Sequence, residues 1–581
     1  MTDMKIHRQK QSRALLSATA ALALATGFAT GAAAADLTSG TLHNPTAYIP
    51  SQCYTKIVDD AHRVHNPCFT CHARSRPPTW IHDDDLQMSY ALPAPALKNP
   101  WTNLFRDRSA EVAATTDADI LAYVRTDNYR SANGGLALSE KLADLPAGWD
   151  ADGDGKWGGF VPDCRFSFDA EGFDRDPAGT PTGWRAFAYA PLPGGFWPTN
   201  GSTDDVLIRL AEPYRQAASG STDLAVYKLN LAIVEALITR RNVPIEATDE
   251  TRYGVDLDRD GSLGTATHVT YDWAPLDGRD MSYVGAAKAL QENGEAPLAA
   301  GLYPLGTEFL HTVRYIDIDD ATGEVKMAPH MKEVRYMVKT RWQTYADREE
   351  GHLAEAKERT DFPDRIAMFF GDTEHGISNG TGWRLQAFIE AADGSLRPQS
   401  FEETVFCMGC HGGVGVTDDD VFAFSRKLGA NAHNGGWYHW TQKGLRGVPD
   451  PIRTDGEPEY AYYLKNNGAG DEFRNNSEII EKFFDDNGTL RPEMLDALKD
   501  DVAVLLYPSA ERAMTLNKAY RLIVREQSFS KGRDAVVAPP KNVYRDASDA
   551  DEENAPYVAG SQPLGAPYAR RRAAASSATG E

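Results

Sequence analysis

The sequence predicts an α+β fold, with mainly helical regions around two short cysteine motifs and a mixed, loop-rich region between them. Apolar residues recur at helical spacing over residues 54–65 and 116–125, before and after the first motif. Apolar and polar residues alternate over 309–316 and 333–338, a pattern typical of strands. Glycine, proline and aspartate are frequent between these two groups, which indicates many turns.

Both cysteine motifs have the form Cys-x-x-Cys-His, the pattern that attaches haem c covalently. The two thiols add to the two vinyl groups of one porphyrin, and the adjacent histidine reaches the iron from the proximal side. A thioredoxin-like redox pair needs no histidine at this place, and a shared zinc site needs much closer spacing. We therefore predict two haem c groups. Their attachment residues are Cys68, Cys71 and His72 in the first motif and Cys407, Cys410 and His411 in the second.

The helical segments around the first motif resemble the class I cytochrome c fold over about residues 40–130. This resemblance implies a methionine as the distal iron ligand, and Met88 is the candidate, although it lies closer to the motif than that family usually places it. Two such motifs in one exported chain also resemble the dihaem cytochrome c peroxidases and the dihaem rubber oxygenases at the haem sites. The resemblance implies a haem-dependent redox function.

Four histidines are further candidates for the distal side of either iron. His311 and His330 fall on the expected strands, where a lone histidine is more often simply packed or exposed. His433 and His439 lie in a cluster with tryptophan and tyrosine, residues that pack well against a porphyrin or fill a core. Distance along the chain does not select among these histidines.

The N-terminus has the features of a secretory signal peptide. Basic residues precede an apolar stretch at 14–28, and three alanines at 33–35 come directly before Asp36. We expect cleavage there, with no transmembrane segment in the mature protein and a periplasmic or secreted location. In that oxidising compartment Cys53 and Cys164 are expected to form a disulfide; a thiolate ligand to haem iron is the other interpretation.

The charge of the chain is strongly negative, formally −23 at pH 7. Removing the predicted signal, with four basic residues and one acidic residue, leaves about −26. This charge argues against nucleic acid as a partner and favours periplasmic redox proteins, in particular basic ones.

Two acidic turns match the first half of a calcium-binding loop, in which carboxylates at positions 1, 3 and 5 converge and glycine follows at position 6. Val161 and Thr267 stand where a bidentate glutamate completes such a loop, so a further ligand must come from elsewhere, with Asp163 and Asp272 as candidates. Surface turns without an ion are the alternative. The candidate calcium ligands are Asp150, Asp152 and Asp154 in the first turn and Asp256, Asp258 and Asp260 in the second.

The chain is much longer than two haem modules require. We predict a signal peptide (1–35), a first haem domain (36–132), a middle region with the acidic turns (133–300), a second haem domain (301–530) and a disordered tail (531–581). The predicted function is electron transfer through both haems. An oxidoreductase with one catalytic haem is the alternative.

Overall fold

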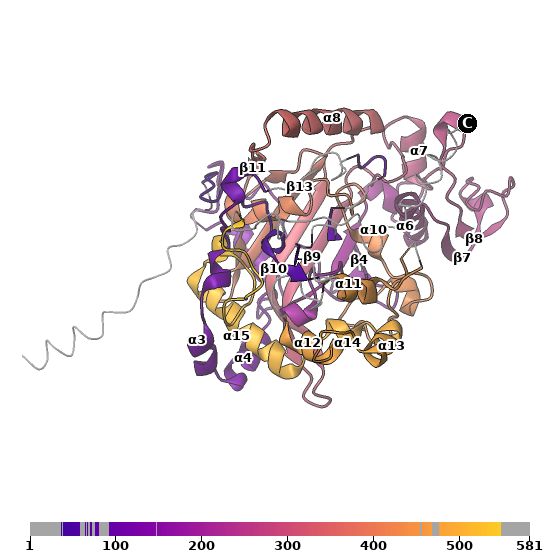
Figure 1. Ribbon diagram of the computed structural model, residues 1–581. Helices are drawn as coiled ribbons and strands as arrows, with labels where there is room; N and C mark the ends of the chain where they lie inside the picture. Colours follow the sequence, from indigo (N-terminus) through magenta and orange to yellow (C-terminus); the bar gives the residue numbers. More distant parts are fainter. Residues whose placement is uncertain are drawn as a thin grey trace, which may run out of the picture.

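Ten antiparallel strands form a large sheet at the centre of the computed structural model (Figure 1). Their spatial order is β11-β12-β13-β10-β9-β6-β4-β3, with β14 beside β13 and β5 beside β9. The strands are β3 (Phe173–Arg175), β4 (Pro181–Phe187), β5 (Thr203–Asp204), β6 (Val206–Arg209), β9 (Glu308–Ile318), β10 (Val325–Lys339), β11 (Phe370–Asp372), β12 (Gly376–Ser378), β13 (Trp383–Glu390) and β14 (Leu396–Pro398). Helices surround this sheet, so the predicted α+β class is confirmed.

The structure describes residues 37, 39–58, 64–65, 67, 70–72, 76–80, 92–146, 148–453, 456–467 and 476–547. The predicted signal peptide, Cys68 and Met88 lie outside these residues. Residues 531–547 pack against the rest of the protein, since Val543 and Tyr544 are buried in the main core. The ordered chain therefore continues beyond residue 531, where the predicted tail was expected to begin.

The central hairpin of the sheet consists of β9 and β10, and both predicted strands lie within them. Alternating burial follows from the two-residue period of a strand. One face carries Phe309 and Met337, which join the largest core cluster, and the other carries Leu310 and Val334, which join a separate cluster. Both faces of the sheet are thus covered.

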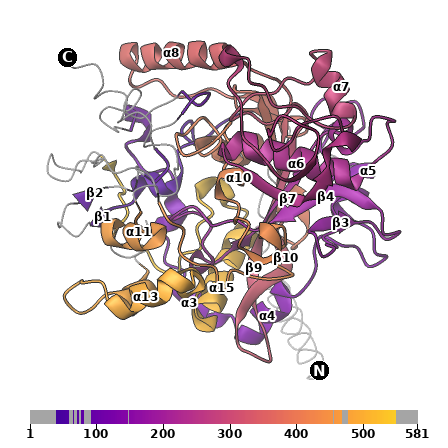
Figure 2. The ribbon, with the colours of Figure 1, turned by 90° about the vertical axis from the view of Figure 1, so that its right-hand side faces the viewer.

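Helices close these faces and the edges of the fold. The predicted helix at 116–125 is confirmed as α4 (Asp117–Val124), whose first turn is capped by the Thr116 hydroxyl accepting from the Asp119 amide. It packs with α15 (Ala510–Glu526) against β9. Figure 2 shows α8 (Tyr345–Asp361) along the opposite side of the molecule from α13 (Pro492–Asp500).

The predicted helix at 54–65 is wrong in its described part. Residues Ser51–Tyr54 form a 3-10 turn, and β1 (Ile57–Val58) pairs with β2 (Val64–His65). The Lys56 amide donates to the carbonyl of Asn542, and Thr55 forms a bridge with Val543. Pairing with the distant C-terminal segment overrides the helical spacing of the side chains.

The remaining helices are mostly short, apart from the sixteen-residue α6. The other helices are α3 (Ser109–Ala114), α5 (Ala137–Ala143), α6 (Leu224–Thr239), α7 (Ala286–Glu292), α9 (Phe401–Val405), α10 (Ala423–Arg426), α11 (Glu459–Asn467), α12 (Ser477–Phe483) and α14 (Ala503–Leu506). A small second sheet pairs β7 (Val243–Asp249) with β8 (Thr265–Val269). In the part of the chain that the structure describes, no helix combines the length and apolar character needed to span a membrane.

Candidate functional site

The second cysteine motif is held by the end of a well-capped helix. Ser400 and Glu403 form a reciprocal capping box at the start of α9, and the chain then passes directly into a 3-10 turn, Phe406–Gly409. The amides of Cys410 and His411 both donate to the carbonyl of Cys407, at 3.2 and 3.1 Å. This turn brings the two thiols and the imidazole of the predicted haem site together.

The thiols of this motif lie in a buried environment. Burial raises the pKa of Cys410 to about 11, and the neighbouring Cys407 adds to the shift. Burial also raises the pKa of Cys407, opposed by the positive charges of Arg335 and Arg533. The thiols are therefore protonated at neutral pH. The positive charge of Arg335 opposes the upward pKa shift of both thiols.

His411 is oriented by the main chain. Its Nδ1 lies 2.8 Å from the carbonyl oxygen of Asp420. Because a carbonyl only accepts, Nδ1 carries the proton and Nε2 keeps its lone pair. Nε2 makes no hydrogen bond to any residue within the described ranges. This is the arrangement that second-shell groups impose on a histidine that binds a metal through Nε2.

The two motifs lie next to each other despite their distance in the sequence. The amide of Val416 donates to the carbonyl of Cys71 at 3.1 Å, and the guanidinium of Arg76 is 3.4 Å from the carboxylate of Asp418. Gly409, inside the second motif, faces the carbonyl of Tyr48 so closely that a Cβ atom would stand 2.0 Å from that oxygen. The segment around the first motif is therefore packed directly on the second.

The carbonyl that contacts His411 belongs to a turn with a strained backbone. Asp419 and Asp420 both have left-handed backbone conformations, with φ of 52° and 63°, and both are completely buried. Non-glycine residues in this region cost of order 1–3 kcal/mol each and are maintained only when their surroundings fix them. The surroundings therefore fix this turn, and with it the Asp420 carbonyl that accepts from His411.

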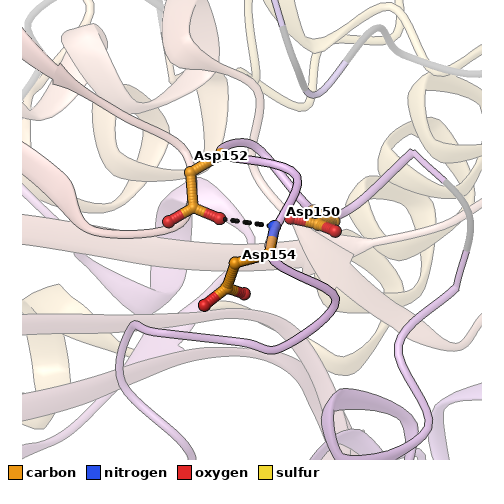
Figure 3. A group of neighbouring side chains, drawn as sticks. All are labelled: Asp150, Asp152 and Asp154. Atoms are coloured by element: carbon orange, nitrogen blue, oxygen red, sulfur yellow. Dashed lines mark hydrogen bonds between the residues drawn. The ribbon is translucent and has the colours of Figure 1, made fainter.

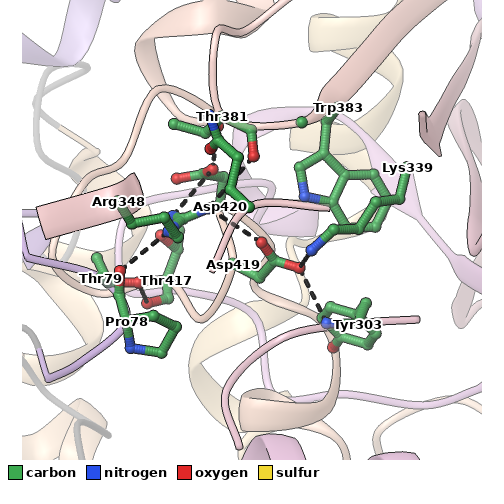
Figure 4. A network of polar contacts seen from close by, with 12 residues as sticks. Pro78, Thr79, Tyr303, Lys339, Arg348, Thr381, Trp383, Thr417, Asp419 and Asp420 are labelled. Atoms are coloured by element: carbon green, nitrogen blue, oxygen red, sulfur yellow. Dashed lines mark hydrogen bonds and ion pairs between the residues drawn. The ribbon is translucent and has the colours of Figure 1, made fainter. Parts of the chain in front are cut away.

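Buried cations hold this turn in place (Figure 4). Arg348 of α8 lies 3.1 Å from Asp419 and 3.4 Å from Asp420, and Lys339 of β10 pairs with Asp419. The Thr381 hydroxyl donates to Asp420. Arg348 also donates to the carbonyl of Pro78, which follows the first motif, at 2.9 Å. One ion network thus connects the chain segments behind both motifs.

His311 differs from His330 and His439 because its Nδ1 makes no hydrogen bond to a described residue. It stands opposite Arg335 on the β9–β10 ladder and is partly buried. Its Nδ1 is enclosed and makes no hydrogen bond within the described part of the chain. Burial lowers the pKa of His311 to about 3, and the charge of Arg335 acts in the same direction.

The other candidate histidines are placed differently. Nδ1 of His330 lies 2.8 Å from the Thr126 carbonyl, and its Nε2 lies 3.0 Å from Glu390. His439 likewise uses both nitrogens, toward Thr441 at 2.8 Å and Asp205 at 2.9 Å. His433 is exposed and packs against Tyr438. Iron binding by His330 or His439 would break a buried hydrogen bond.

The predicted Cys53–Cys164 disulfide is wrong. Cys164 carries a free, completely buried thiol. It belongs to the core cluster on one face of the sheet, together with Trp184, whereas Cys53 packs against the cluster on the other face. The sheet itself separates the two sulfurs.

The first acidic turn brings its carboxylates together (Figure 3). Ligand atoms of Asp150, Asp152 and Asp154 all lie within 4.8 Å of one another. The predicted extra ligand, Asp163, is instead engaged by the indole of Trp184 at 2.7 Å and by Arg209 at 2.6 Å.

The second acidic turn contains a residue that the sequence did not indicate. Asp256 and Asp258 are grouped with Glu250, while Asp260 stays outside the group. Glu250 is buried and accepts from the amides of Leu257, at 2.5 Å, and Gly264, at 2.8 Å. It precedes the loop, where the calcium-loop pattern holds no position for a ligand. The other predicted ligand, Asp272, pairs with Arg279 at 2.5 Å.

Comparison with known proteins relates the chain to lipoproteins. A family model described as a “-like lipoprotein” matches residues 37–496. An “Uncharacterized lipoprotein” of Aquifex aeolicus (strain VF5) is 30% identical over 547 residues, which cover 85% of this chain and 86% of that protein. No solved structure matches the chain.

These findings correct the resemblance to the dihaem c-type cytochromes. The chain is not identified as a relative of the dihaem cytochrome c peroxidases or rubber oxygenases, because its match extends over most of its length to lipoproteins instead. The attachment motif is only five residues long, and such a short pattern occurs on unrelated folds.

Proposed function

We propose that this chain, which belongs to the “-like lipoprotein” family, binds two haem groups covalently and transfers electrons outside the cytoplasm. The first group is attached at Cys68 and Cys71 with His72 as iron ligand. The second is attached at Cys407 and Cys410 with His411 as iron ligand. Bound haem would supply one-electron redox chemistry.

The orientation of His411 is the observation that carries this proposal. A histidine without a metal role gains most by hydrogen bonding through both nitrogens, as His330 and His439 do. His411 instead has Nδ1 bound to the Asp420 carbonyl and Nε2 without a hydrogen bond to any described residue, beside two thiols that form no disulfide. The donor set fits a covalently attached haem, since each of the three side chains has the chemistry that the attachment needs.

The contact between the motifs supports electron transfer. Through the Val416–Cys71 hydrogen bond the two attachment segments share one interface, so electrons would pass between neighbouring centres and not across the whole molecule. The buried network of Arg348 and Lys339 holds the two segments in a fixed relation. A rigid pair of sites lowers the reorganisation that accompanies each transfer.

The test is a haem count with spectra of the purified, full-length protein exported by a haem c-maturing host. Two haems per chain that are low-spin and do not bind carbon monoxide are expected. A chain without covalent haem would contradict the proposal. Two haems, one of which binds carbon monoxide, would instead support the alternative function, an oxidoreductase with one open coordination position.

Location and partners follow from the signal and the charge. We propose that the predicted signal is cleaved between Ala35 and Asp36 and that the mature protein is exported, to the periplasm or the medium. Its large negative charge favours association with basic redox proteins, an electrostatic attraction that weakens as salt rises.

We also propose calcium as a structural ligand of the acidic turns. Calcium is expected to raise the melting temperature over that in a chelator, because the ion neutralises carboxylates that otherwise repel one another. Asp256→Asn is expected to reduce this calcium effect, whereas Asp260→Asn, outside the carboxylate group, leaves it unchanged. Melting that is independent of calcium would contradict the proposal.

A further inference from the structure

We infer that a cavity between α10, the loop that follows it and the start of α11 binds a small organic anion with an apolar body. The volume of the cavity is about 500 Å³, which is within the range of sites that hold small molecules. None of the described residues of the cysteine motifs or the acidic turns lines it. The inference is therefore independent of the proposed haem and calcium sites.

One wall of the cavity is a rigid extension of the central sheet. Beyond the end of β4, the amide of Ala190 donates to the carbonyl of Arg426 at 2.9 Å, and the amide of Leu428 donates to the carbonyl of Ala188 at 3.0 Å. The chain then folds back, and the amide of Ala188 donates to the carbonyl of Gly436 at 2.8 Å. Only glycine fits there, because a Cβ atom would stand 2.2 Å from the carbonyl oxygen of Leu428. This wall is fixed before a ligand binds, which lowers the cost of binding.

The acidic groups that line the cavity are already engaged by other partners. Glu459 pairs with Arg426 at 3.0 Å, and both side chains are buried. Asp450 accepts from the amides of Tyr460 and Ala461, at 2.8 and 3.0 Å, in the first turn of α11. Burial raises the pKa of Asp450 to about 7, so a large part of this carboxyl group is protonated at neutral pH. The acidic groups therefore add little negative charge to the cavity.

Two exposed basic side chains of the cavity have no such partner. Arg241, which follows the C-cap residue of α6, and Lys443 both line the cavity. Neither forms an ion pair with a residue in the part of the chain that the structure describes. A third cation, Lys427, is compensated by Glu235 at 3.1 Å. The charge that remains available is positive, in a chain whose net charge is −23, and it favours an anionic ligand.

Apolar side chains line much of the rest of the cavity. Leu428, Val448 and Ile452 contribute aliphatic surface, and Pro449 and Pro451 lie between them. Ile452 is 63% exposed, so contact with a ligand would remove apolar area from water. Apolar surface combined with two uncompensated positive charges suits an organic acid better than an inorganic anion.

The test is a calorimetric titration of the full-length exported protein with 2-naphthoate, for which one saturable site is expected. The amide 2-naphthamide has nearly the same shape but no charge, and we expect it to bind roughly tenfold more weakly because charge-assisted hydrogen bonds are lost. Inorganic phosphate, which has no apolar body, is expected to bind more weakly than 2-naphthoate. Equal affinity for the acid and its amide would contradict the anionic class of ligand, and no saturable binding of the acid would overturn the site.

Charge variants distinguish this cavity from the general surface. Lys443→Gln and Arg241→Gln are each expected to weaken the binding of 2-naphthoate roughly tenfold. Arg446→Gln is the matched control, because it removes the same charge from the same loop, whereas Arg446 does not line the cavity and pairs with Glu324 at 3.2 Å. The control is expected to keep the affinity of the unaltered protein. Equal losses in all three variants would show attraction by surface charge alone and would overturn the inference.

Gly429→Phe provides a second measurement that does not depend on charge. Gly429 lines the cavity, and a Cβ atom at this position would meet no other atom within 4 Å, so the larger side chain has room to fill part of the open space. Binding of both 2-naphthoate and 2-naphthamide is expected to be lost, while the melting temperature stays unchanged. Retained binding in this folded variant would place the ligand elsewhere on the protein and refute the assignment to the cavity.

Discussion

A protein with Cys407→Ala and Cys410→Ala is expected to carry half of the covalent haem of the unaltered protein. Both thioether bonds of the second site are lost, whereas the first site keeps its cysteines. The measurement is the haem-to-protein ratio after denaturation and extraction, which remove any haem that is not covalently attached. We expect the ratio to fall from two to one.

Cys164→Ala is the matched control for this variant. Its thiol is also buried and free, but it lies in the core cluster of the other sheet face. The control is expected to retain both haems. A full haem ratio in the double variant would remove the second site from the proposal, and equal losses in both variants would point to misfolding.

Arg348→Met is expected to destabilise the folded protein by about 3–5 kcal/mol, the usual cost when one partner of a buried ion pair is removed. Arg348 is buried and pairs with both Asp419 and Asp420, so its loss leaves buried carboxylates with only Lys339 as a charged partner. The strained turn that orients His411 also loses its support. Thermal unfolding, followed by circular dichroism, measures the effect.

Lys357→Ala on the same helix is the control. Lys357 and its partner Asp361 are exposed, and a surface pair of this kind contributes less than about 1 kcal/mol. A similar melting temperature for both variants would show that the buried network does not stabilise the fold as proposed.

Local features of the fold were predictable where the sequence pattern agrees with the tertiary environment. The N-capped helix after Thr116 and the alternating strands of the β9–β10 hairpin are examples, because caps and side-chain periodicity act over a few residues. The segment at 54–58 shows the opposite case, since its partners lie at 542–543 and no local pattern reports them.

The candidate site, too, could be predicted from the sequence only in part. The proposed attachment residues were predicted from their spacing alone, and so were the aspartates of the acidic turns. Glu250 was missed because a ligand outside the loop pattern has no spacing to identify it. The predicted Cys53–Cys164 disulfide was wrong. Both cysteines lie outside the two motifs, but the sequence does not show that a sheet lies between them.

By itself, then, the sequence determined the chemical groups that this protein has available: two pairs of thiols, each followed by an imidazole, and two sets of converging carboxylates. Only the tertiary structure decided which groups meet. It placed Cys71 beside Val416, oriented the Asp420 carbonyl toward His411 and left Nδ1 of His311 without a hydrogen bond to any described residue, while His330 and His439 found partners. The physical reason is that covalent spacing fixes contacts within a turn of chain, whereas contacts between distant segments depend on how the whole sheet and its ion network pack.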